Sequence, residues 1–276
     1  MPHLELALIS GDYQLAIQAE KAGIDRIFFD LETLGKEQRQ AGEGLFLSQH
    51  RPEDVPKVAS VLTQCRLMVR INSFHENTPR EVEQVLKDGA QIIMLPMFEN
   101  AFQVKEFISF VGGRATTSLL LENKVALDNI EEIVQIPGID EIHIGLNDLR
   151  LSLGLDVIFE VLCHGVLDSL SEVIRGANIR FGFGGVSSPN ATYLPVDPKR
   201  IIAEQIRLGS TVALLGRSFR EPFEDLSSPD KLVEEVQAIR QCVSHWQNSS
   251  EADFLANRTA LAEEVQSWKM SVRREF

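Results

Sequence analysis

Cysteine is scarce in this sequence, and its scarcity excludes two kinds of scaffold. The 276 residues include three cysteines, Cys65, Cys163 and Cys242, which lie far apart and form no Cys-x-x-Cys pair. An odd number of widely spaced cysteines does not build a disulfide framework or a zinc cluster. We therefore expect a reducing compartment, the cytoplasm.

Long apolar runs are also missing. No stretch approaches the roughly 20 apolar residues that cross a bilayer. Residues 1–5 show no basic start followed by an apolar segment, which is the pattern of a signal peptide. The sequence thus predicts a cytoplasmic protein with no membrane partner.

Basic residues are outnumbered. The chain has 27 Lys and Arg against 40 Asp and Glu, a formal net charge of −13 at pH 7. Such a surface repels phosphate backbones and anionic lipids, so nucleic acid is excluded as a partner. An anionic substrate needs a local arginine or a metal ion to approach this protein.

What the sequence does contain is a repeated alternation of short apolar runs and amphipathic stretches. Several runs are continuously apolar, as strands of a parallel sheet covered on both faces are. Eight strand–helix units in one chain predict an α/β fold, a closed (β/α)₈ TIM barrel over residues 1–248. An open doubly wound sheet is the alternative, but the first turn lacks its glycine-rich phosphate motif. The predicted strands are 4–10, 26–32, 67–72, 91–98, 116–123, 141–148, 180–186 and 211–219. Between the sixth and seventh strands, the amphipathic stretch predicts one long helix over 156–175.

Two segments fall outside this count. Residues 33–51 form a long polar connection that we interpret as a lid or binding loop. Residues 249–276 are predicted to be a helical extension that packs on the barrel or on a neighbouring subunit. Because an exposed apolar stripe is an aggregation hazard, we expect a homo-oligomer. The stripe comprises Phe254, Leu255, Leu261, Val265 and Trp268.

Polar residues follow the predicted strands where a barrel of this type carries its catalytic groups. Asp30 and Glu32 end the second strand, Arg70 the third, Glu122 the fifth and Asp148 the sixth. Two carboxylates in an open site suit Mg²⁺ or Mn²⁺, which keep waters and accept substrate oxygens. A nearby arginine fork binds a small anionic carboxylate substrate at two points.

These segments resemble the HpcH/HpaI aldolase and citrate lyase β-chain family, a group of pyruvate-type TIM barrels. The resemblance runs from residue 22 to about residue 219. Its most specific part is the segment Gly-Leu-Asn-Asp-Leu-Arg-Leu-Ser-Leu-Gly at 145–154. The other matching segments are 22–32, 69–72, 89–97 and 120–123.

The resemblance implies the roles of individual residues. Glu122 and Asp148 hold the divalent metal, and Arg70 is a catalytic residue that contacts the substrate carboxylate and the enolate oxygen. Backbone groups of the turn containing Gly145, Asn147 and Asp148 bind the substrate. The implied activity is that of a metal-dependent lyase of the aldehyde-lyase or oxo-acid-lyase type. It cleaves a carbon–carbon bond of a 2-keto acid through a metal-stabilised enolate.

One position departs from the family pattern. The family places a histidine base directly after the acidic end of the second strand, whereas Thr33 follows Glu32 here. We take His50 as the candidate catalytic replacement. A citrate-synthase-like condensation, a citryl-CoA-lyase-like cleavage and a non-catalytic ligand-binding barrel stay open as alternatives.

Two further residues have less specific interpretations. Arg70 could instead form a structural ion pair with Asp30 or Glu32. His143 lies inside an apolar strand, and we assign it to the core or to the helix-facing side of that strand.

Overall fold

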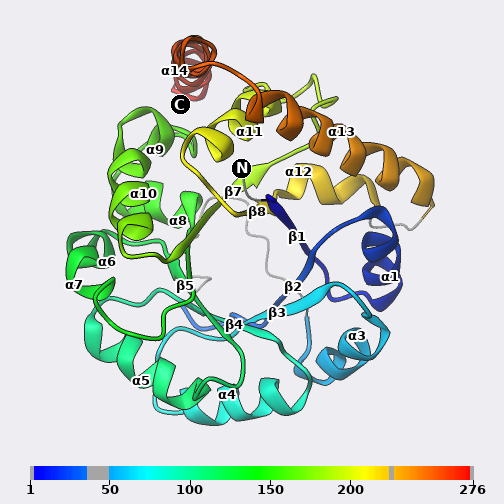
Figure 1. Cartoon of the computed structure of the whole chain (residues 1–276), viewed down its shortest axis with the longest axis vertical. Coiled ribbons are helices and arrows are strands. Elements are labelled where there is room, and N and C mark those ends of the chain that lie inside the picture. Colours follow the sequence, from blue (N-terminus) through cyan, green and yellow to red (C-terminus); the bar gives the residue numbers. More distant parts are fainter. Residues whose placement is uncertain (1–2, 36–49, 224–226, 274–276) are drawn as a thin grey trace.

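Eight parallel strands form a closed barrel in the computed structural model, which describes residues 3–35, 50–223 and 227–273 (Figure 1). Each strand pairs with the next in chain order, and β8 pairs with β1. The predicted TIM barrel is therefore confirmed. The strands are β1 Glu5–Ile9, β2 Arg26–Asp30, β3 Arg66–Arg70, β4 Ile92–Pro96, β5 Thr116–Leu121, β6 Glu141–Ile144, β7 Arg180–Val186 and β8 Val212–Leu215.

Helices surround the strands on the outside of the ring (Figure 1). The α-helices are α1 Tyr13–Ala22, α3 Val55–Val61, α4 Thr78–Lys87, α5 Ala101–Val111, α6 Lys124–Asp128, α7 Ile130–Ile133, α8 Leu146–Ser152, α9 Glu160–Cys163, α10 Val166–Gly176, α11 Pro198–Arg207, α12 Arg217–Arg220, α13 Pro229–Gln247 and α14 Glu251–Val272. Short 3₁₀ turns cover Pro52–Asp54 and Glu221–Phe223.

The barrel has two apolar cores because alternate residues of each strand point to opposite faces. The larger core lies between the outer faces of the strands and the helices. The smaller one fills the barrel interior and includes Phe28, Met68 and Leu120. Burial on both faces explains why the strands show continuous apolar runs in the sequence.

Ion pairs close the barrel interior at the end where the strands begin. Arg26 is fully buried, and its guanidinium donates two hydrogen bonds to Glu141, at 2.7 and 2.9 Å. Its third donor, Nε, reaches Glu5 at 2.5 Å, and Arg180 also donates to Glu5. Although burial opposes ionisation of Glu141, the Arg26 guanidinium outweighs it and lowers the pKa of this carboxyl. At this end of the barrel, the carboxylates of Glu5 and Glu141 are therefore neutralised by Arg26 and Arg180.

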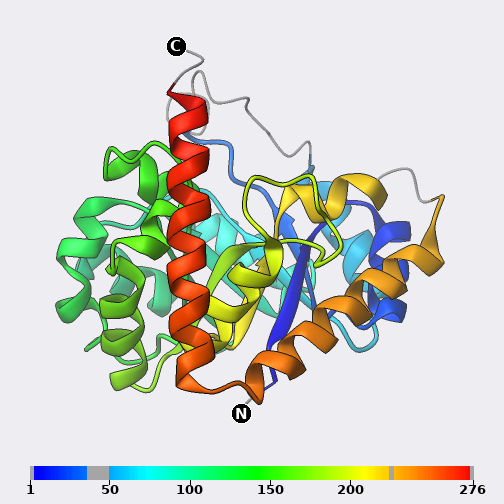
Figure 2. The ribbon, with the colours of Figure 1, turned by 90° about the horizontal axis from the view of Figure 1, so that it is seen from above.

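Helix α14 lies along the outside of the barrel, and Figure 2 shows it running from the end where the strands begin to the end where they finish. It packs against α11 and α9. Leu261 and Val265 are buried there, and Phe254 and Trp268 are partly buried. Leu255, which we predicted to share this stripe, is 66% exposed, so that assignment is wrong. The barrel itself covers the stripe, and the homo-oligomer stays a prediction.

Three predicted element boundaries are also wrong. Strand β8 ends at Leu215 and not at residue 219, because Arg217–Arg220 form helix α12. Strand β6 ends at Ile144, so Asp148 lies in helix α8 and not at the end of a strand. The long helix predicted over 156–175 is divided into α9 and α10. Gly165 separates them with a φ of 75°, a left-handed conformation that glycine adopts readily.

The predicted lid and the predicted absence of a membrane-spanning segment can be compared only with the described residues. Most of the predicted lid, residues 36–49, lies outside the described residues. Among those that are described, no helix is long and apolar enough to cross a membrane.

Candidate functional site

A cavity of about 270 Å³ opens into the barrel at the end where the strands finish. It brings together five of the predicted site residues, which come from β3, the end of β5 and the start of α8. They are Arg70, Glu122, Gly145, Asn147 and Asp148. Five residues spread over 79 positions of sequence thus share one cavity, as their predicted roles require.

The carboxylate of Glu122 is held against a glycine. Glu122 is 2% exposed and directly follows β5. A Cβ placed on Gly145 would come within 2.6 Å of Glu122 Oε2 and 2.7 Å of its Cβ. Any side chain at position 145 would therefore displace this carboxylate, which explains the glycine.

Asp148 approaches the cavity from the first turn of α8 and is half-buried. Its neighbour Asn147 lines the cavity too, and Arg150 lies 3.4 Å from the Asn147 side-chain oxygen. Arg150 also donates to the backbone oxygen of Asp156 at 3.2 Å. The turn that carries Asp148 is thus connected to the segment that follows α8.

Arg70 is fixed by carboxylates. Its Nε and Nη2 each donate to Asp30 at 2.8 Å, and its Nη1 lies 3.3 Å from Glu32. Burial opposes the charge of the guanidinium, but Asp30 and Glu32 outweigh burial and raise the pKa of Arg70. Arg70 therefore forms the ion pair that we considered as an alternative, and it also lines the cavity as a permanent positive charge.

His50 is not among the residues that line this cavity. Its Nδ1 accepts a hydrogen bond from the backbone N–H of Asp30 at 3.0 Å, and its ring packs on Phe29, with centroids 4.7 Å apart. It also fills the space beside Gly11, where a Cβ would come within 2.5 Å of the ring. In this position His50 supports the end of β2, and its acid–base role stays a prediction.

Two cavity residues were missed by the sequence analysis. Arg217 follows β8 and is exposed at the cavity. His143 was assigned to the core or to the helix-facing side, but it lines the cavity as well. The strand alternation held the missing signal, because Glu141 and His143 fall on one face of β6, and Gly145 directly follows that strand in the same alternation.

The chemistry of the cavity fits a divalent cation that retains water. In the parts of the chain given by 3–35, 50–223 and 227–273, no three His, Cys, Asp or Glu side chains cluster to hold a metal alone. Mg²⁺ does not need such a cage, since one or two carboxylates and substrate oxygens satisfy it. Glu122 and Asp148 provide two carboxylates at one cavity.

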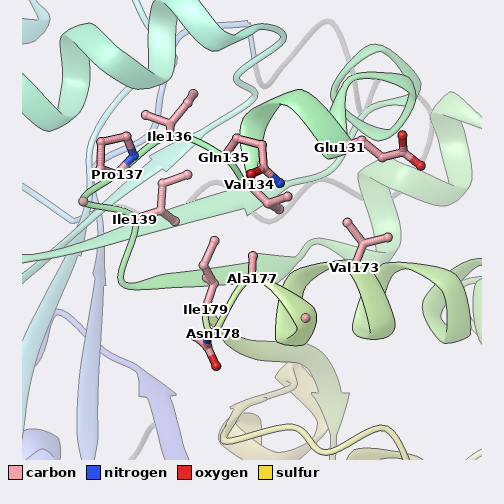
Figure 3. Close-up of a pocket in the computed structure, with 12 residues that line it drawn as sticks. Glu131, Val134, Gln135, Ile136, Pro137, Ile139, Val173, Ala177, Asn178 and Ile179 are labelled. Carbon is pink, nitrogen blue, oxygen red and sulfur yellow. The ribbon is translucent and has the colours of Figure 1, made fainter.

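A larger hollow, of about 680 Å³, lies at the other end of the strands (Figure 3). It is bounded by the connection from α7 to β6 and by the residues between α10 and β7. Ile136, Pro137 and Ile139 line one side, and Ala177 and Ile179 line the other (Figure 3). It contains none of the predicted site residues, so its size alone does not make it the functional site.

Comparison with known proteins gives one sequence family. Residues 8–161, more than half of the chain, match the family described as HpcH/HpaI aldolase/citrate lyase. Over 139 and 137 aligned residues, this chain is 32% and 33% identical to the 2-keto-3-deoxy-L-rhamnonate aldolases of Salmonella typhi and Escherichia coli O1:K1 / APEC. These matches cover 39% and 38% of this chain. The chain spans about half the length of these curated relatives, 52% and 51%.

Solved structures show the same fold at low sequence identity. An HpcH/HpaI aldolase from Desulfitobacterium hafniense DCB-2 has a TM-score of 0.61 and 14% identity. That match covers 84% of this chain and 93% of the other. The protein CitE from Mycobacterium tuberculosis, in complex with magnesium and pyruvate, also has a TM-score of 0.61 and 14% identity, over 94% and 98% of the two chains.

Proposed function

Because the chain belongs to the HpcH/HpaI aldolase/citrate lyase family, we propose that it is a divalent-metal-dependent carbon–carbon lyase of the aldolase type. The observation that carries this proposal is the single cavity that gathers Arg70, Glu122 and Asp148 at the end of the barrel. Catalytic groups of TIM-barrel enzymes lie at this end. The substrate class that we propose is a small 2-oxo acid with a hydroxyl group two carbons from the ketone.

Glu122 and Asp148 are the residues that would hold Mg²⁺ or Mn²⁺. The bound ion would supply Lewis-acid polarisation of the substrate ketone. The contact of Glu122 with Gly145 supports this role, because it fixes the carboxylate in the cavity without a competing side chain at that position.

Arg70 has the charge and the fixed position needed to stabilise the enolate that forms during the reaction. When the C3–C4 bond of a 4-hydroxy-2-oxo acid breaks, the 4-hydroxyl loses its proton to solvent water and C4 becomes the carbonyl carbon of an aldehyde. The electron pair of the broken bond moves to the ketone oxygen at C2, and an enolate forms. A permanently charged guanidinium beside that oxygen stabilises the developing negative charge. The fork on Asp30 keeps Arg70 in place before substrate arrives, so little reorganisation is needed.

The lining and the volume of the cavity, about 270 Å³, are consistent with our proposal of a small substrate. Apolar side chains of Ile9, Phe28 and Leu214 line the same volume as the charged groups. Charged groups beside apolar side chains act more strongly on a bound anion than they would in water. The N–H of Gly145 already donates to the backbone oxygen of Leu121 at 2.9 Å, so it is not available to a substrate. We propose that the backbone N–H groups at 146–148 bind the substrate carboxylate, because the first N–H groups of a helix have no partner within the helix.

Exchange of the methyl protons of pyruvate tests this function directly. An enzyme that forms the pyruvate enolate replaces these protons with deuterium in D₂O, which proton NMR measures. We expect exchange that depends on Mg²⁺ or Mn²⁺ and stops with EDTA. The absence of exchange with either metal, together with no cleavage of 2-keto-3-deoxy acids, would contradict the proposal.

A further inference from the structure

His143 occupies a position in the barrel that its sequence context does not suggest. Of the six histidines in the chain, it is the one found among the described residues that line the cavity with Arg70 and Glu122. It is 2% exposed. A buried imidazole in the wall of this cavity is within reach of a ligand bound there.

The strand register places His143 one layer below the proposed metal ligand. On β6, side chains two residues apart point to the same face, about 7 Å from each other. His143 therefore lies one step below Gly145, and Glu122 rests on Gly145. Leu120 and Gly182 are its partners on the neighbouring strands. His143 is thus part of the floor of the cavity.

Gly182 provides room for this ring. A Cβ at position 182 would come within 3.0 Å of His143 Cε1 and within 2.3 Å of the backbone oxygen of Val212. The narrow interior thus accepts an imidazole at 143 because its neighbour has no side chain.

The imidazole is incompletely satisfied by the protein. Its Nε2 is buried and has no hydrogen-bond partner within the described part of the chain. Burying a polar atom in this way destabilises the folded state, so such atoms are rare outside functional sites. A phenylalanine would fill a similar volume without that cost, which indicates a use for the polar ring.

The surroundings keep this ring neutral. Burial lowers the pKa of His143 to about 4, and the opposing effect of Glu141 does not offset it. Arg26 and Arg180 lower the pKa further from the closed end of the barrel, where Glu5 opposes them. On the cavity side the charged groups are Asp30, Arg70, Glu122, Asp148 and Arg217. A neutral imidazole in this position offers an N–H donor and not a positive charge.

We propose that His143 is a further catalytic residue, one that donates a hydrogen bond from its neutral imidazole to the substrate oxygen that gains negative charge. This inference rests on the proposed lyase function. It assigns the ring the role of a fixed donor, which stabilises the charge that develops during the reaction.

Three variants of this residue test the inference. His143→Phe keeps a ring but removes the donor, whereas His143→Asn and His143→Gln keep an amide N–H near the position of one or the other ring nitrogen. We expect His143→Phe to lower kcat for pyruvate proton exchange by about 100-fold. The better of the two amide variants should recover about 10-fold of that loss. Because the ring does not titrate near neutral pH, the limbs of the pH profile should keep their positions in every variant.

Thermal unfolding distinguishes this role from packing. We expect His143→Phe to raise Tm by about 2–4 °C while it lowers turnover. Ser118→Ala is the matched control, since Ser118 Oγ is also buried without a hydrogen-bond partner among the described residues, and Ser118 is not among those lining the cavity. This control should raise Tm slightly and leave turnover unchanged. A His143→Phe variant that turns over like wild type would overturn the inference, and so would Phe and amide variants of equally low turnover and lowered Tm.

Binding of oxalate in the presence of Mg²⁺ separates this inference from the proposed function. Oxalate is a planar dianion that resembles the enolate of pyruvate. We expect His143→Phe to weaken its Kd by about 10-fold, as the loss of one hydrogen bond to a charged group does. If the wild type binds oxalate but does not exchange pyruvate protons, the lyase function fails while the binding role of His143 is still measured. Equal oxalate affinity of wild type and His143→Phe would overturn the role of His143 alone.

Discussion

Where the strands of the barrel begin, Glu5 and Glu141 are matched by Arg26 and Arg180 in one hydrogen-bonded group. Where the strands finish, Asp30, Glu32, Glu122 and Asp148 face Arg70 and Arg217. The first end is electrically balanced, and the second carries an excess of carboxylates. Buried charges that pair with one another can fill the closed end of the barrel without leaving an uncompensated charge. An excess of carboxylates at an open cavity instead favours the binding of a divalent cation.

The largest expected effect comes from neutralising the acidic end. Glu122→Gln and Asp148→Asn each preserve side-chain volume but remove a ligand charge. We expect turnover to fall by more than about 100-fold, since changes in the residues that merely support metal ligands already cost 10–100-fold. Calorimetric titration with Mn²⁺ should show a matching loss of affinity, with circular dichroism unchanged. Wild-type affinity in both variants would show that the metal binds elsewhere.

The balanced end should respond in stability and not in chemistry. Arg26→Leu leaves Glu141 buried beside Arg180 alone, and we expect a loss of about 3–5 kcal/mol in the free energy of unfolding. Urea denaturation measures this loss, and kcat per folded molecule should stay at the wild-type value. The double variant Arg26→Leu/Glu141→Leu should recover most of the stability. A drop in kcat as large as that of Glu122→Gln would remove the distinction between the two ends.

Arg70→Lys tests whether the arginine serves the ion pair, the substrate or both. Lysine keeps the charge but cannot form the two-point contact with Asp30. We expect kcat to fall by about 10–100-fold, or roughly 1.4–2.7 kcal/mol of transition-state stabilisation. Steady-state kinetics on the cleaved substrate measures the loss. Near-normal turnover with lowered Tm would show that the arginine is structural.

His143 lies between the two ends, and its protonation should lower stability in acid and leave stability at neutral pH unchanged. Burial lowers the pKa of His143 in the folded protein to about 4, below the usual histidine pKa of 6.5. Between these values the unfolded chain binds a proton that the folded chain does not, so stability is present above pH 6.5 and is lost as pH falls toward 4. The slope contributed is about 1.4 kcal/mol per pH unit. Urea denaturation at several pH values should show a flatter dependence in His143→Phe, and an unchanged slope would place the proton elsewhere.

Local sequence patterns predicted the barrel because each strand is apolar enough to be recognised alone. Strands β1 to β5 begin and end within two residues of the predicted runs. The end of β6 was missed because Asn147 and Asp148 follow the apolar residues directly, and nothing in the run marks the turn at Gly145. The division of the helix predicted over 156–175 was also missed. The left-handed φ of Gly165, which separates α9 from α10, is set by the surrounding structure and not by the local sequence.

The site was predictable only in part. Strand ends identified Arg70 and Glu122, because parallel strands bring their last residues to one edge. The pairing of Arg26 with Glu141 joins residues 115 positions apart, and no spacing rule indicates it. His143 is buried, as one of its two predicted positions requires, but its apolar neighbours gave no indication that it also lines the cavity. Which face of α14 packs against the barrel depends on the shape of the surface formed by α9 and α11, which the sequence pattern does not reveal. Leu255 belongs to the predicted apolar stripe but points away from that surface.

The pairing of β1 with β8 has a consequence for how this chain acquires its structure. Glu5 and Val212 are register partners, so the ring cannot close until residue 212 has been made. Contacts this distant in sequence form slowly, because a long loop must be ordered before the contact can form. Until then β1 presents an unpaired edge that can pair with another chain. The Arg180 contact with Glu5 forms across the same closure, and it therefore stabilises the finished ring without assisting the early steps of folding.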